Sequence, residues 1–505
     1  MSDRTIPQTA RMSQRPDFEV FVAADGAFAA FEEAVLDAQT SITGGFRIFD
    51  MSTPLLSDTA RAVGETWFDL LVHVLRRGVR MDLAVSDFDP VYATELHQQA
   101  WATVKQGAAL VETAGVPATQ VRVRALLHPA TPGMAPWLAF LPASLRKKRA
   151  RHAALSRDAL AEAPGLSRNL PDLHPVTHHQ KLAVIDDDTL YIGGLDLNER
   201  RFDTPDHDRP AAQTWSDVQV IVRNDPAVAE AKAHIETFDD VVRGNTPPPP
   251  VQRLRRTLSA DRRFKLPFLS PRTLVSEIET LHRDAFTQAR HLIYIETQFM
   301  RSQPMAEALA EAAQARPDLT LILILPALPE PAAFDADDDI GFETRYGMGL
   351  ERDALRTLRD GFGDRATIAS PVQPVLAARE TRATLAGSPI IYVHNKVLVQ
   401  DADRAFVGSA NMNGRSLHWD TEAGLLVDSP ARVGTLRSAL FHHWWRADIA
   451  RDWTDPAQMQ PLWQAEIWRN DVRNPDTRRG FLVSHDARLH EAKGQSLPLA
   501  TDDMV

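Results

Sequence analysis

The sequence predicts an α/β protein built from two similar lobes that are related by a pseudo-twofold axis. The main observation is a duplicated spacing of His, one residue, Lys, four residues, Asp, six residues and then a pair of small residues. The first copy comprises His179, Lys181, Asp186, Gly193 and Gly194, and the second comprises His394, Lys396, Asp401, Gly408 and Ser409. Because the copies agree at every fixed position and lie in opposite halves of the chain, we expect a repeated structural unit.

The second observation is that the same order of predicted elements precedes each copy. Hydrophobic periodicity predicts helix 28–39, strand 41–49, helix 66–77 and strand 79–85 in the first half, and helix 272–290, strand 291–296, helix 305–315 and strand 319–325 in the second. Four consecutive prolines at 247–250 favour extended backbone between the halves. We therefore expect a first lobe at 15–245, a Pro-rich and basic linker at 246–265, and a second lobe at 266–480.

Composition restricts the classes of function. The chain has 505 residues, 44% hydrophobic and 24% charged, which is typical of a globular protein with a large core. Its net charge of -11 disfavours an extended nucleic-acid footprint, and the lack of cysteine excludes disulfides and thiolate chemistry. The sequence shows neither a secretory leader nor an apolar run of membrane-spanning length. We expect a cytoplasmic or peripheral membrane location, and export by a leaderless route stays open.

The motifs themselves indicate a chemistry. Residues two apart in a strand point the same way, so His179 shares a face with Lys181, and His394 with Lys396. Displacement at a phosphodiester needs a nucleophile, a proton donor for the leaving alkoxide and cations near the phosphoryl oxygens. Two imidazoles and two ammonium groups, brought together in one cleft between the lobes, supply this equipment.

Flanking segments extend the pattern. The first copy continues as GGLDLNERRFDTPDHD and TWSDVQV, the second continues as GSANMNGRSLHWDTEAGLLV, and YIETQFM precedes the second copy at 294–300. These segments and the duplicated motif resemble the phospholipase D superfamily, and more closely its phospholipase-type branch. The resemblance covers both halves and implies the phospholipase D fold, two mixed-sheet lobes with α-β-α layers.

The resemblance also implies roles for particular residues. His179 is expected to attack phosphorus to give a phosphohistidine intermediate, and His394 to act first as acid and then as base. The expected supporting residues are Lys181, Lys396, Asn411 and Asn413 at the phosphoryl oxygens, and Asp217 and Glu422 as carboxylates that orient the histidines. For Asp186 and Asp401 a catalytic role and a structural role stay open.

The first copy departs from the second where Asp196 replaces the equivalent of Asn411. An anion facing a phosphate would repel it, so Asp196 is expected to orient Lys181 or to bind the substrate headgroup. Asn198 is then expected to supply the amide that this half would otherwise lack.

The resemblance implies hydrolysis of glycerophospholipids to phosphatidic acid and a headgroup alcohol, with transphosphatidylation when an alcohol replaces water. The alternatives are a phosphatidyltransferase of the cardiolipin-synthase type, a nuclease-like phosphodiesterase and an inactive lipid-binding module. We expect a monomer that needs no cofactor or metal and meets its phospholipid substrate at a membrane surface, without nucleic acid as a partner.

Three further segments have alternative readings. The stretch 136–151 is apolar and then basic, which is compatible with peripheral membrane contact or with an ordinary amphipathic helix. His174, His178 and His179 could bind a metal, although the neighbouring Lys181 disfavours it. The acidic run 335–339 could bind calcium but lacks the spacing of a known loop, so a solvated loop is favoured.

Overall fold

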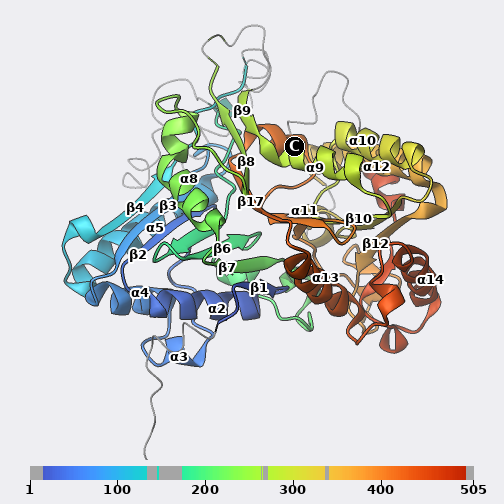
Figure 1. Cartoon of the computed structure of the whole chain (residues 1–505), viewed down its shortest axis with the longest axis horizontal. Coiled ribbons are helices and arrows are strands. Elements are labelled where there is room, and N and C mark those ends of the chain that lie inside the picture. Colours follow the sequence, from blue (N-terminus) through green and yellow to red (C-terminus); the bar gives the residue numbers. More distant parts are fainter. Residues whose placement is uncertain are drawn as a thin grey trace, which may run out of the picture.

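The structure is a computed structural model that describes residues 15–133, 145, 146, 173–262, 264, 271–335 and 340–495. Within these residues the chain forms two large β-sheets, one from each half of the sequence (Figure 1). The first sheet contains β1 (Phe18–Phe21), β2 (Ser41–Phe46), β3 (Arg80–Ser86), β4 (Val121–Leu126), β5 (Leu182–Ile185), β6 (Thr189–Gly193) and β7 (Gln219–Arg223). The second contains β8 (Leu254–Ala260), β9 (Arg272–Ser276), β10 (Leu292–Thr297), β11 (Thr320–Ile324), β12 (Ala366–Pro371), β15 (Lys396–Gln400), β16 (Arg404–Gly408), β17 (Glu422–Val427) and β18 (Leu482–Ser484).

The two sheets have the same topology. The first has the order β1-β7-β6-β5-β2-β3-β4, and the second contains the matching series β8-β17-β16-β15-β10-β11-β12, extended by β9 and β18. In each sheet three strands run parallel, β2-β3-β4 and β10-β11-β12, and the motif strands β5 and β15 pair antiparallel with β2 and β10. The predicted pair of similar mixed-sheet lobes is confirmed.

Helices cover the outer faces of both sheets. The first lobe uses α2 (Ala24–Asp37), α4 (Trp67–Arg76) and α5 (Thr94–Ala114), and the second uses α9 (Glu277–Gln288), α10 (Gln303–Ala315) and α12 (Phe342–Phe362). The other α-helices within the described residues are α3 (Asp58–Arg61), α8 (Pro226–Val242), α11 (Glu330–Phe334), α13 (Pro430–Trp445), α14 (Met459–Val472) and α15 (Arg488–Lys493). A short hairpin, β13 (Thr384–Leu385) and β14 (Ser388–Pro389), lies between β12 and β15.

The inner faces of the sheets share one hydrophobic core. Alternate residues of β5, β6 and β7 pack in the same buried cluster as alternate residues of β10, β15, β16 and β17, together with α8 and α13. This arrangement follows from the nearly continuous apolar sequences of the motif strands, which are buried on both faces. The lobes are therefore joined by a core that neither half could bury alone.

Local signals explain where the elements begin and end. Helix α4 starts at a capping box formed by Thr66 and Asp69, and α8 starts at Asp225, whose side chain accepts from Ala227 N, followed by Pro226 at the first helical position. Helix α5 ends at Gly115, whose φ of 68° lies in the left-handed region that favours glycine.

Two expectations need correction. The segment 272–290, predicted as one helix, begins with strand β9, because its first residues pair with β8 and make an edge of the second sheet. The segment 246–265, predicted as linker, contains β8, which pairs with β17 and is almost entirely buried. Tertiary pairing overrides local pattern in both places.

The motif aspartates tie the ends of strands together. Asp186 follows β5 in a left-handed turn (φ 52°), and its carboxylate accepts from the backbone N–H groups of Gln39, Thr40 and Ser41 at 2.7–3.0 Å. Asp401 follows β15 with the same φ and accepts from three backbone N–H groups, those of Arg290, His291 and Leu292, at 2.8–2.9 Å. These contacts favour the structural interpretation of both aspartates over the catalytic one.

Asp401→Ala should therefore destabilise the fold. Three partly or fully buried backbone N–H groups would lose their acceptor, so we expect the free energy of unfolding to fall by about 2–4 kcal/mol. Urea denaturation followed by circular dichroism measures it. Asp403→Ala is the matched control, because Asp403 pairs on the surface with the Arg290 side chain and should change stability by less than about 1 kcal/mol. Equal losses in the two variants would contradict the anchoring role.

Candidate active site

The two motifs meet where the lobes are joined by short backbone bridges. His179 N donates to Thr421 O at 2.8 Å, and His394 N donates to Ser216 O at 2.8 Å. Thr421 and Ser216 directly precede Glu422 and Asp217 in sequence. Each histidine is thus held by backbone hydrogen bonding next to a carboxylate of the other lobe.

The side chains repeat this crossed arrangement. His179 Nδ1 lies 3.0 and 3.1 Å from the two carboxylate oxygens of Glu422, and His394 Nδ1 lies 2.6 Å from Asp217 Oδ2. An ionised carboxylate accepts only, so when Asp217 and Glu422 are ionised, Nδ1 of each neutral imidazole carries the proton and Nε2 keeps its lone pair. Both rings line the same cavity, so each can present Nε2 to a bound group.

The cavity has a volume of about 600 Å³ and draws residues from both lobes. Its cationic and amide groups are Arg47, Arg201, Arg301, Arg415, Gln298, Asn411 and Asn413. Its other lining residues include the acidic Asp89, Glu330, Glu343 and Asp420 and the aromatic Phe88, Tyr92, Trp215 and Phe299. Such a site fits an anionic group at the histidines and a mixed polar and apolar group further out.

The motif lysines are placed behind the histidines. Lys181 Nζ donates to the carbonyl oxygen of His179, and Lys396 Nζ donates to that of His394. Both ammonium groups are buried, and burial lowers the pKa of Lys181 and lowers that of Lys396 to about 7. Neither lysine is among the residues that line the cavity, so direct coordination of phosphoryl oxygens by them stays a prediction.

The two half-sites differ in their polar partners. Asp196 accepts from Ile48 N at 2.9 Å and lies 3.8 Å from Lys181 Nζ, whereas Asn411 donates to Gln298 Oε1 at 3.2 Å and faces the cavity. Of the two roles open for Asp196, the geometry favours orientation of Lys181 over contact with a headgroup.

The other two predicted amide residues, Asn413 and Asn198, lie in different places relative to the cavity. Asn413 lines the cavity and accepts from Ser416 N at 3.2 Å. Asn198 instead accepts from Arg201 N at 3.2 Å, where it caps a short 3-10 helix, and is not a lining residue. The structure therefore does not bring Asn198 to the cavity as a substitute for Asn411.

Several lining residues were missed by sequence reasoning. Arg47 directly follows β2 as Gln298 directly follows β10, so the first half-site has a guanidinium where the second has an amide. Arg201 Cζ lies 3.8 Å from the centroid of the Trp215 ring, and Trp215 packs on His394 with ring centroids 4.5 Å apart. Aligning the two halves strand by strand would have identified Arg47, but only the fold shows that Arg201 reaches the other motif.

Buried charge sets the protonation of the histidines. Burial, and then the nearby lysines and arginines, lower the pKa of His179 and of His394 well below the usual value. Burial raises the pKa of Asp217 to about 7 and that of Glu422 to about 8. The free site thus disfavours the imidazolium form of both histidines. A bound anion would offset the surrounding cations and so favour the imidazolium form.

The small residues that end each motif make room for the carboxylates. A Cβ at Gly194 would lie 2.0 Å from Asp217 Oδ1, so a larger residue would displace that carboxylate. Ser409, at the equivalent place, donates its hydroxyl to Glu422 Oε2. The first motif therefore needs glycine here, while the second uses the hydroxyl to hold its carboxylate.

The other candidate groups are placed apart or lie outside the described residues. His174 Nδ1 contacts His128 O and His178 Nδ1 contacts Thr421 Oγ1, so these imidazoles do not converge with His179 on one metal. Of the acidic run only Asp335 is described, and the stretch 136–151 is outside the described residues except at 145 and 146.

In the described part of the chain no helix combines the length and the apolar character needed to cross a bilayer.

The chain is distantly similar to known proteins. The family model described as "Cardiolipin synthase, PLD-like domain" matches residues 283–445. Phospholipase D1 of Saccharomyces cerevisiae is 21% identical over 343 residues, which cover 50% of this chain and 20% of the yeast protein. Phospholipase D2 of Bos taurus is 24% identical over 324 residues, which cover 54% of this chain and 34% of the bovine protein. The matches thus span about a third or less of these relatives.

A solved structure shows the same fold. The crystal structure of phosphatidylserine synthase from Haemophilus influenzae Rd KW20 superposes with a TM-score of 0.51 at 12% identity, covering 92% of this chain and 96% of that one. The likeness extends over both lobes, so the duplicated architecture is common to the two proteins.

Gly194→Ala should disrupt the site without large loss of stability elsewhere. The added methyl group would push Asp217 away from His394 Nδ1, so we expect turnover of a phosphodiester substrate to fall by about 10²-fold or more. The matched control is Gly434→Ala in α13, where an added Cβ meets nothing within 4 Å and should keep full activity. Unchanged turnover by Gly194→Ala, measured on folded protein, would contradict the role given to Asp217.

Proposed function

We propose that the chain belongs to the phospholipase D superfamily and that it hydrolyses glycerophospholipids to phosphatidic acid and the free headgroup alcohol. The observation that carries the proposal is the crossed pair of histidines. Two imidazoles from different lobes line one cavity, and each is held at Nδ1 by a carboxylate of the other lobe. This is an arrangement suited to double displacement at a single phosphorus atom.

In the first step His179 Nε2 attacks phosphorus, forming an N–P bond while the bond from phosphorus to the headgroup oxygen breaks. His394, protonated once the anionic diester is bound, gives its Nε2 proton to the leaving alkoxide. Asn411, Asn413 and the arginines that line the cavity stabilise the charge on the phosphoryl oxygens. The products of this step are the free alcohol and a phosphatidyl group attached to His179.

In the second step neutral His394 takes a proton from water as the water oxygen attacks phosphorus. The N–P bond breaks and the electron pair returns to His179 Nε2, which releases phosphatidic acid. Glu422 holds His179 in the orientation that this in-line attack requires, and Asp217 does the same for His394. His394 thus regains the proton that it gave in the first step, so both histidines end in the states that they had in the complex with substrate.

Transfer of the phosphatidyl group to an alcohol is a second candidate function. It uses the same intermediate, and the matching family model carries the description of a cardiolipin synthase. A cavity of about 600 Å³ with acidic residues such as Glu330 and Glu343 on its wall could bind a hydroxylated acceptor. The ratio of the two products in one reaction separates the candidates.

The lipid assay should give a clear result. Incubated with phosphatidylcholine vesicles and ethanol in the presence of a chelator, the protein is expected to yield phosphatidic acid and phosphatidylethanol, measured by mass spectrometry. His179→Ala and His394→Ala should each lower the rate by roughly 10³-fold or more, because each step needs both imidazoles.

His442→Ala is the matched control, since His442 bonds only within α13 to Ser438 and should leave the rate unchanged. Full activity in either active-site variant would reject the assigned roles. Cleavage of single-stranded DNA in place of lipid would support the nuclease alternative.

Anion binding should weaken as the pH rises. The free site keeps its imidazoles neutral and lowers the pKa of Lys396 to about 7, and a bound anion raises these pKa values, so binding takes up protons. Affinity is therefore greatest below the pKa of the free site, falls by about tenfold per pH unit for one linked proton between the pKa of the free site and that of the liganded site, and levels off above the latter.

Sulfate is a suitable probe, because it does not titrate in this range. Calorimetric titration between pH 6 and 9, in buffers of different ionisation enthalpy, measures both the affinity and the protons taken up. A sulfate affinity that stays constant over this range would contradict the charge balance described for the site, and His394→Ala should reduce the proton uptake.

A further inference from the structure

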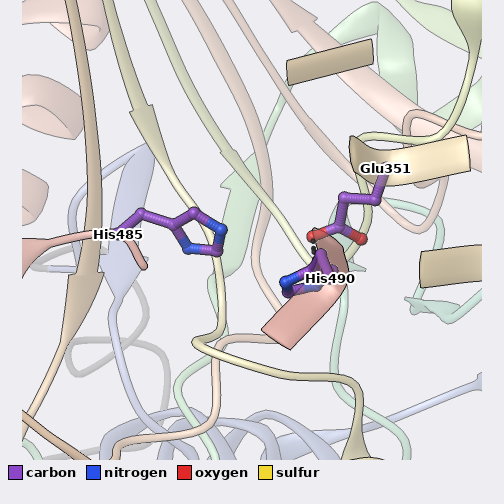
Figure 2. Close-up of side chains that lie close together, drawn as sticks. All are labelled: Glu351, His485 and His490. Atoms are coloured by element: carbon purple, nitrogen blue, oxygen red, sulfur yellow. Dashed lines mark ion pairs between the residues drawn. The ribbon is translucent and has the colours of Figure 1, made fainter. Parts of the chain in front are cut away.

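A second cluster of buried titratable side chains lies in the second lobe, outside the catalytic cavity. It is formed by Glu351 of α12, His485 after β18 and His490 of α15, which Figure 2 shows turned toward one another. Each residue is at most 7% exposed, and one potential ligand atom from each lies within 4.8 Å of the others. The cluster brings together three segments that are separated in the sequence by up to 139 residues.

The atoms of the cluster have few hydrogen-bond partners. Glu351 Oε2, His485 Nε2 and both ring nitrogens of His490 are buried and form no hydrogen bond. The shortest contact joins His490 Nε2 to Glu351 Oε1 at 3.6 Å, which exceeds hydrogen-bond length. Buried polar atoms are normally paired, so a group of four without partners indicates a site for a ligand.

The donor set is one that transition metals prefer. Two imidazole nitrogens and one carboxylate oxygen bind zinc at about 2.0–2.2 Å, which corresponds to ligand atoms about 3.3 Å apart around a tetrahedral ion. Small side-chain rotations within the 4.8 Å cluster would reach this spacing. Hydrogen bonding of His485 Nδ1 to Ser370 Oγ at 2.8 Å leaves Nε2 for the metal, as outer hydrogen bonds do in metal sites.

We propose that Glu351, His485 and His490 bind one divalent transition-metal ion, with zinc as the best match to the ligands. The fourth position around the ion would be taken by water or by the second oxygen of Glu351. The site is separate from the histidines of the phosphodiesterase proposal, and it does not depend on that proposal.

Charges of both signs surround the cluster. Arg301 Nε lies 3.8 Å from Glu351 Oε2 and Arg359 also acts on both imidazoles, while Asp486 acts on them with the opposite sign. The Glu351 carboxylate offsets part of the charge of the ion.

The position of the site indicates what the metal would do. Helix α15 and the residues after it pack closely on α12, where Gly349 lies against the backbone of Gly494 and Gln495. An ion held by Glu351 and His490 would fasten this C-terminal segment to α12, and His485 would join it to the edge strand β18. Glu351 also contacts Arg301, which lines the catalytic cavity, so the ion would stabilise one wall of that cavity.

The test is metal binding by the full chain without an affinity tag of histidines. Protein stripped with a chelator is incubated with Zn²⁺, desalted and analysed by elemental mass spectrometry, and Co²⁺ is used in parallel as a spectroscopic probe. We expect one equivalent of zinc, tetrahedral Co²⁺ absorption bands and a rise in the melting temperature on adding either metal.

Glu351→Gln, His485→Gln and His490→Gln should each lose the bound equivalent. His282→Gln is the matched control, because it removes another buried imidazole whose Nδ1 bonds to Ile278 O. His394→Ala should keep the zinc, which separates this site from the catalytic histidines. Ser370→Ala retains all three ligands and should weaken zinc binding by about tenfold or more.

The proposal is overturned if the wild-type chain retains no zinc, if the equivalent survives all three ligand substitutions, or if His394→Ala removes it. Circular dichroism shows which variants fold. If the ligand variants fail to fold, the zinc affinities of the wild type and of Ser370→Ala are compared instead. An unchanged affinity in Ser370→Ala would place the ion elsewhere and overturn the proposal.

Discussion

The pairing of each histidine with a carboxylate from the opposite lobe is the constraint on which the rest of the structure depends. The His179–Glu422 and His394–Asp217 contacts each follow directly from a backbone hydrogen bond between the same two segments. The backbone hydrogen bond fixes where the two segments cross. The side chains at and next to the bonded residues then have few orientations open to them. Two imidazoles can therefore be positioned by the same construction, used twice around a pseudo-twofold axis.

Symmetry brings the histidines together, but differences between the halves are needed for them to act differently. A phosphodiester reaction requires one neutral and one protonated imidazole. The first half-site has Arg47 and Asp196 where the second has Gln298 and Asn411, and Glu422 receives a hydroxyl hydrogen bond where Asp217 faces a glycine. These exchanges change the local charge while leaving the backbone of both halves alike, which is how a duplicated scaffold can hold two distinct roles.

Sequence reasoning recovered the parts of the molecule that local spacing encodes. The duplicated motif predicted two lobes and strands at the motif lysines, and β5 begins directly after Lys181 while β15 begins at Lys396. It could not recover β8, because the pairing that makes it a strand comes from β17, more than 160 residues later. The resemblance implied Asp217 and Glu422 as orienting carboxylates, but not that each pairs with the histidine of the opposite lobe. The contact of Arg201 with Trp215 and the Glu351 cluster were not predicted either, since each depends on how the fold brings separate segments together.

The crossed pairing also couples the geometry of the site to the stability of the whole chain. Each half contributes a histidine whose orienting carboxylate belongs to the other half, so a single lobe would be an incomplete site as well as one with an exposed hydrophobic face. Buried lysines and carboxylates cost desolvation energy, and they are tolerated only when they are paired in the assembled site. Separation of the lobes would expose the shared core and break both histidine–carboxylate contacts together. Hydrophobic burial in the core shared by the lobes therefore also holds the buried charged groups in place.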